Sequence, residues 1–211
     1  MKKGLTIILL LAMTLGCWAQ RKTLSATLYK EFRPSVVTFK DGHQSHQALT
    51  NVFLKNSSLL FLQGEYTMEA NMDNILAVDF EGGKSFVNID NQLAYRVHSV
   101  GGNGLFCVEL FDQESYEQNI RNNVNISNLD LSSDQIGTTT VDLNNEEDYK
   151  LPVFRHYYYR LGSEYVKVHE RTLLRTLKKD QVVMMKRIMA MPDFSWQKEE
   201  SLKQLLNAIS K

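Results

Sequence analysis

The sequence has little cysteine, proline or tryptophan, and the scarcity of cysteine limits how the fold can be stabilised. The 211 residues include two cysteines, Cys17 and Cys107, three prolines and two tryptophans. Only Cys107 lies after residue 19, so a chain cleaved there can form no internal disulfide, even in an oxidising compartment. We therefore expect packing alone to stabilise the fold.

The chain also lacks an excess of charge of either sign. It carries 24 basic and 24 acidic side chains, and the 192 residues that follow Ala19 carry 22 and 24, a net charge of −2. Domains that bind nucleic acids usually present a strongly basic face or an overall basic balance. We therefore expect no nucleic-acid partner.

The sequence lacks the short motifs of the common enzyme and cofactor sites. It contains no G-x-S-x-G, no H-E-x-x-H and no GKS or GKT. Three glycines at 101, 102 and 104 lie between two predicted strands, so no helix N-terminus is available there to hold a phosphate. The acidic residues of 112–148 lack the alternating spacing of a calcium loop. We predict no catalytic, cofactor-binding or metal site from motifs.

Two pairs of residues could supply chemistry without a motif. His43 and His46 follow Asp41 closely and could ligate zinc together with it, but side chains three apart on a strand point to opposite faces. Cys107 could act as a nucleophile with His98, but it lies in the apolar run LFCVELF, where a buried cysteine is usual. One alternative stays open, a hydrolase whose site is assembled from scattered carboxylates and histidines.

The first twenty residues have the pattern of a secretory signal peptide. Two lysines precede an apolar run over residues 5–15, which is too short to cross a bilayer as a helix. Small residues at Cys17 and Ala19 then predict cleavage after Ala19, leaving Gln20 as the N-terminus. In the alternative, residues 15–17 form a partial lipobox and Cys17 is acylated. Both readings predict an exported protein, periplasmic or secreted, and the second adds a membrane anchor.

Residues 20–111 read as a β-rich domain. Asp41 and Gly42 lie between two predicted strands, at 35–40 and 43–53, and predict a hairpin with a type I′ turn. Turn residues recur about every ten positions after that, which is typical of a small antiparallel β-sandwich or barrel-like sheet. The further strands are predicted at 59–62, 66–68, 75–80, 85–89, 93–100 and 105–111.

A polar segment separates this domain from a second hairpin. Residues 112–148 are rich in Asn, Ser, Asp and Glu, which predicts an exposed connection with at most one short element, around 117–124. Residues 149–169 have high β-propensity around a turn at Gly162, which predicts a β-hairpin. The sequence leaves open whether this hairpin joins the first sheet.

The apolar spacing changes to that of helices in the C-terminal segment, residues 170–211. We predict two short amphipathic α-helices divided near Pro192, with Ser195 as the N-cap of the second. The fold class is therefore mainly β, of the α+β kind.

The elements begin with a V-x-x-K-D-G strand and end with a D-F-x-W-x-x-x-E-x-L-x-x-L-L helix. With these two motifs, the order of the elements resembles a group of uncharacterised small secreted proteins of Bacteroidetes-type bacteria. The resemblance implies this fold and an exported location, and it implies no activity. The residues that carry it are Val37, Lys40, Asp41, Gly42, Asp193, Phe194, Glu200, Leu202, Leu205 and Leu206.

Two surfaces are candidates for binding. Tyr157, Tyr158 and Tyr159, together with Phe154, are expected to expose at least one aromatic face to a protein or a glycan, unless the ring packs on a neighbouring element. Basic residues of the C-terminal helices form a face that could touch anionic lipid headgroups or could simply be solvated. These basic residues are Arg171, Arg175, Lys178, Lys179, Lys186 and Arg187.

The sequence therefore favours a non-enzymatic cell-envelope protein that acts through surface contacts. The expected partner is another envelope protein or a glycan, with a membrane as partner only through acylation or the basic C-terminal helix. No cofactor is expected.

Overall fold

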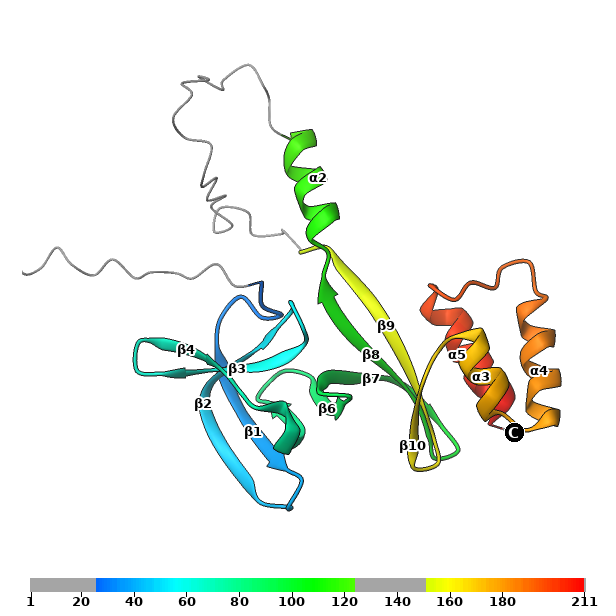
Figure 1. Ribbon diagram of the computed structural model, residues 1–211, viewed down its shortest axis with the longest axis horizontal. Helices are drawn as coiled ribbons and strands as arrows, with labels where there is room; N and C mark the ends of the chain where they lie inside the picture. Colours follow the sequence, from blue (N-terminus) through cyan, green and yellow to red (C-terminus); the bar gives the residue numbers. More distant parts are fainter. Residues whose placement is uncertain (1–25, 124–150, 211) are drawn as a thin grey trace, which may run out of the picture.

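A computed structural model describes residues 26–123 and 151–210. The predicted signal peptide, Cys17, the cleavage point after Ala19 and most of the polar connection, residues 124–148, lie outside these residues. The described part is a single curled antiparallel sheet of ten strands with helices at one end (Figure 1). The predicted class, mainly β with a barrel-like sheet and C-terminal helices, is confirmed.

Strands that are consecutive in the chain are neighbours in the sheet, except that β5 pairs with β1 and not with β4. From one edge to the other the order is β10-β9-β8-β7-β6-β5-β1-β2-β3-β4. The strands are β1 (Arg33–Phe39), β2 (Gln44–Phe53), β3 (Ser58–Gln63), β4 (Tyr66–Glu69), β5 (Ile75–Phe80), β6 (Ser85–Ile89), β7 (Gln92–Val100), β8 (Asn103–Phe111), β9 (Val153–Leu161) and β10 (Glu164–Lys167).

The turns follow from residues that accept a positive φ, although the type I′ turn predicted at Asp41 and Gly42 is wrong. Only Gly42 has a positive φ there, 89°, and its N–H donates to the carbonyl of Phe39, so the β1–β2 connection is one residue longer. A two-residue turn with both φ values positive occurs instead at Asp90 and Asn91, 52° and 64°. The hairpin itself is confirmed.

The second hairpin joins the first sheet. β9 pairs with β8 from Gly104↔Arg160 to Phe111↔Val153, and β10 then pairs with β9 at the edge. The segment between β8 and β9 begins with α2 (Gln113–Asn123), four residues before the element predicted around 117–124. Asp112 caps α2, because its carboxylate accepts from the backbone N–H and the hydroxyl of Ser115 at 3.0 and 2.7 Å.

Three helices, and not two, close the chain. They are α3 (Glu170–Thr176), α4 (Lys179–Met189) and α5 (Glu199–Ile209), and a short 3₁₀ helix, η1 (Met72–Asn74), precedes β5. The predicted first helix is broken at Leu177 and Lys178, where the Gln181 side chain accepts from the Lys178 N–H at 3.0 Å and starts a new helix. The N-cap of α5 is Lys198, so the prediction of Ser195 is wrong.

Two hydrophobic cores lie along the sheet. The N-terminal core is formed by β1, β2, β3, β5, β6 and β7, and the C-terminal core packs β8, β9 and β10 against α3, α4 and α5. Figure 1 shows the three helices grouped beside the β8–β10 end of the sheet. The opposite face of the sheet carries a third cluster, which includes Phe106, Val108 and Tyr158. Both faces are therefore covered over β7 to β9.

Candidate functional site

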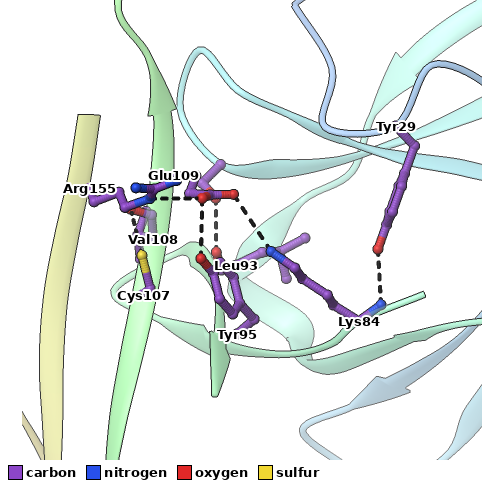
Figure 2. A network of polar contacts seen from close by, with 9 residues as sticks. Tyr29, Lys84, Leu93, Tyr95, Cys107, Val108, Glu109 and Arg155 are labelled. Atoms are coloured by element: carbon purple, nitrogen blue, oxygen red, sulfur yellow. Dashed lines mark hydrogen bonds and ion pairs between the residues drawn. The ribbon is translucent and has the colours of Figure 1, made fainter. Parts of the chain in front are cut away.

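A polar network lies on β7, β8 and β9 where the two main cores meet. The strand register places Glu109 opposite Arg155 and Cys107 opposite both Tyr95 and Tyr157. Since residues two apart on a strand share a face, these side chains all point the same way. Figure 2 shows Tyr95 and Arg155 directed at the Glu109 carboxylate from the two neighbouring strands.

Glu109 accepts hydrogen bonds from two side chains of this network, and a second base lies near its other oxygen. The Tyr95 hydroxyl and the Arg155 Nε each donate to its Oε1 at 3.1 Å. Lys84 Nζ from the β5–β6 turn lies 3.8 Å from Oε2 and 3.5 Å from the centre of the Tyr95 ring. The Glu109 side chain is 11% exposed, whereas the two bases are about half exposed. A nearly buried carboxylate is thus neutralised by bases that extend to solvent.

The network connects the two cores. Tyr95 packs against the N-terminal core and the C-terminal core, and its ring lies edge-on to Phe86 at 6.0 Å. Tyr29, from the segment before β1, accepts from the Lys84 backbone N–H at 3.0 Å through its hydroxyl. The polar contacts therefore connect β7, β8, β9 and the β5–β6 turn where the two cores meet. We call this place the seam, and we call the group of Lys84, Tyr95, Glu109 and Arg155 the seam network.

The protonation of these groups argues against nucleophilic chemistry at the seam. Burial, with the nearby Cys107 and Glu109, raises the pKa of Tyr95 far above its usual range. Burial also raises the pKa of Cys107 to about 11. Because the thiolate and not the thiol is the nucleophile, the raised pKa of Cys107 keeps it mainly in its weakly nucleophilic thiol form near neutral pH.

We expect Tyr95→Phe and Glu109→Gln each to lower the free energy of unfolding by about 1 kcal/mol, as for one hydrogen bond at a partly buried site. The double variant should lose less than the sum, because both changes act on the same hydrogen bond: phenylalanine removes its donor, and glutamine replaces its charged acceptor by a neutral amide oxygen. Urea denaturation of the four proteins measures this coupling. Strict additivity would mean that the 3.1 Å contact contributes nothing to stability.

Cys107 and His98 do not form a pair. Cys107 is fully buried, as the sequence predicts, and its opposite residue on β7 is Tyr95. Instead, Nε2 of His98 lies 3.0 Å from the side-chain oxygen of Asn207 on α5. His98 therefore links β7 to the helices.

The Cys107 thiol should react with Ellman's reagent far more slowly in the folded protein than in the unfolded chain. A pKa raised from 9.0 to about 11 lowers the thiolate population about 100-fold, before burial blocks access. The measurement compares native and urea-unfolded protein at pH 8, with Cys17→Ala so that Cys107 is the only thiol. Equal rates would show that the site opens freely.

The three tyrosines of the run follow the alternative in which their rings pack on neighbouring elements. Tyr157 and Tyr159 face the C-terminal core and Tyr158 faces the third cluster, and all three are no more than 6% exposed. The Tyr159 hydroxyl donates to the Leu202 carbonyl of α5 at 2.7 Å, and burial raises the pKa of Tyr157 to about 12. Only Phe154, which is 52% exposed, remains accessible at the end of β9.

His43, at the β1–β2 turn, also has local partners. The His43 ring stacks on Phe39 with 4.2 Å between the ring centres, and its Nδ1 lies 2.5 Å from a carboxylate oxygen of Asp41. Within residues 26–123 and 151–210, no three His, Cys, Asp or Glu side chains gather where they could hold a metal ion.

An open, polar depression of about 350 Å³ lies between the β9–β10 turn and the start of α4. Its lining is formed by Asn103, Leu161, Gly162, Glu164, Thr176, Leu177, Lys178 and Gln181. It contains neither a histidine nor a cysteine.

The outer side of α4 carries a surface that mixes bases with exposed apolar side chains. Val183 is 66%, Met184 44% and Met191 45% exposed. The basic side chains beside them are exposed as well, and none of them forms a salt bridge with a described residue. We call this the α4 surface and define it as Lys178, Lys179, Val183, Met184, Lys186, Arg187 and Met191.

The sequence predicts the bases of this surface but misses its apolar members. All six predicted basic residues, from Arg171 to Arg187, are exposed, but the exposed apolar residues fall outside the helical stripe that periodicity assigns to the core. The sequence signal for exposed apolar side chains is the run of four consecutive apolar residues at 182–185, since a surface helix buries only one side. No described helix is long and apolar enough to cross a membrane.

Comparisons with protein-family models, with curated proteins and with solved structures found no match to this chain.

Proposed function

We propose that this chain is an exported, non-enzymatic cell-envelope module that binds its partner through the α4 surface. One observation carries the proposal: α4 and its ends leave three apolar side chains in solvent beside four bases that form no salt bridge with a described residue. Exposed apolar residues among charged ones are typical of interaction sites. The signal-peptide pattern at residues 1–19 supports the envelope location.

The rest of the described structure supports this role as a scaffold. The seam network places its carboxylate against internal donors, and the tyrosine run is buried under α5. α5 packs against β7 and β8 on one side and against α4 on the other. The sheet therefore fixes α5, and α5 presents α4 outward.

The proposal is tested by reversing two charges of the α4 surface in the native host. Lys186→Glu with Arg187→Glu should release most of the protein from the envelope fraction into the soluble fraction. The matched control is Lys30→Glu with Lys40→Glu, which changes the net charge equally at exposed positions far from α4 in the chain. If both double variants stay with the envelope as the unmodified protein does, the α4 surface is not the contact region.

Acylation at Cys17 would anchor the protein independently of α4. Mass spectrometry of the mature N-terminus distinguishes an N-terminus at Gln20 from an acylated Cys17. The fractionation is therefore carried out with Cys17→Ala in every variant, so that only the α4 surface can retain the protein.

A further inference from the structure

We propose that the partner of the α4 surface is a membrane surface rich in anionic phospholipid. This inference rests on the proposed function, because it names the partner of the same surface. Three observations lead to it: the arrangement of side chains on α4, the local charge and the outward position of the helix.

The outward row of α4 alternates a base, an apolar residue and a base. Lys179, Val183 and Arg187 are spaced four apart and so lie along one side of the helix. Met185, which is fully buried, lies on the opposite side, as 100° per residue requires. Long basic side chains can reach headgroup phosphates while the Val183 side chain between them enters the boundary of the acyl chains.

The charge of this stretch matches an anionic surface. Residues 178–191 contain four bases and one acid, Asp180, whereas the rest of the chain carries a net charge of −3, or −5 once residues 1–19 are removed. Each lysine or arginine near an anionic leaflet strengthens binding by about fivefold. A net charge of +3 is therefore enough for reversible association when a few apolar side chains also enter the interface.

The composition of the surface favours a lipid over an acidic protein. Hot spots of protein-binding sites are usually side chains seated in a pocket, often aromatic ones, whereas the apolar members here are a valine and two methionines and the one arginine, Arg187, is exposed. The helix is also outermost: Figure 1 shows α4 at the side of the helical group away from the sheet. A helix face with flexible aliphatic side chains can lie on a bilayer without a matching partner shape.

The test uses exported protein carrying Cys17→Ala, purified without detergent, and flotation with lipid vesicles. Vesicles of phosphatidylcholine with about 30 mol% phosphatidylglycerol should bind it at about 0.05 M salt, and binding should be lost at about 0.5 M salt. Pure phosphatidylcholine vesicles should bind it weakly. Lys186→Glu with Arg187→Glu should weaken binding at least about 25-fold, and Lys30→Glu with Lys40→Glu less than about threefold.

A second pair of variants tests the apolar part without changing charge. Val183→Ser should weaken vesicle binding about fivefold, whereas Leu49→Ser, at a residue 47% exposed on β2, should leave it unchanged. All these positions are exposed, so circular dichroism and melting temperature should match the unmodified protein.

Absence of binding to the anionic vesicles, or binding insensitive to salt and to the α4 charge reversal, would overturn the lipid proposal. If the charge reversal still releases the protein from the native envelope in that case, the proposed function stands and the partner is an acidic protein. If neither measurement responds to the α4 variants, both proposals fail.

Discussion

Replacement of Leu205 by alanine is expected to lower the free energy of unfolding by about 3 kcal/mol. Leu205 lies on α5, has no exposed surface and belongs to the C-terminal core. The loss combines the transfer free energy of the removed methyl groups with the cavity left between α5 and the sheet, which tight packing cannot fully close. The helices should therefore loosen from the sheet first.

Urea denaturation followed by circular dichroism measures this loss. Gln204→Ala is the matched control, because Gln204 is the exposed neighbour on the same helix and its replacement should change stability by less than about 0.5 kcal/mol. Equal stabilities for the Leu205→Ala and Gln204→Ala proteins would mean that α5 does not hold the helices to the sheet.

Replacement of Asn51 by alanine is expected to lower the free energy of unfolding by about 3 kcal/mol, as much as Leu205→Ala does. Asn51 on β2 is fully buried, and its amide holds the segment before β1. Its oxygen accepts from the N–H groups of Tyr29 and Val52 at 3.0 and 2.9 Å, and its Nδ2 donates to the carbonyls of Tyr29 and Glu31 at 2.8 and 3.3 Å. Alanine would leave several backbone groups without partners.

Two further variants sharpen the expectation for Asn51. Asn51→Asp should be at least as destabilising, because the carboxylate loses both donated bonds and faces two carbonyl oxygens. Asn74→Ala, at an exposed asparagine on η1, should change stability by less than about 0.5 kcal/mol. Thermal unfolding compares the three variants, and an Asn51→Ala protein as stable as Asn74→Ala would contradict the assigned role.

The strands are predictable from the sequence because their signals are local. Alternating apolar residues and turn residues define β5 and β6 at the residues the sequence predicts, 75–80 and 85–89. The turn at Asp41 and Gly42 fails only in type, since the same dipeptide also suits a longer connection with one positive φ.

The burial of the tyrosine run could not be predicted, because the residues that cover it come from far along the chain. Tyr159 is buried by α5, whose Leu202 carbonyl accepts its hydroxyl across 43 positions. β-propensity describes a strand with one solvated face, and it cannot show that helices and a third cluster cover both faces of β9.

Local sequence patterns could not predict the seam network either. Glu109 and Arg155 meet only because β9 pairs with β8, and 46 positions separate them in the chain. The break between α3 and α4 is local, but it lacks the usual proline or glycine, and a lysine at the N-cap gives little warning of a new helix.

The claim that the α4 surface is the contact region is tested most directly by photo-crosslinking in the native envelope. A photoreactive amino acid is placed at Val183 in one protein and at Leu49 in another, both carrying Cys17→Ala. We predict adducts at position 183 that disappear with Lys186→Glu and Arg187→Glu, and few at position 49. Equal adducts at both positions, or none at position 183, would contradict the claim.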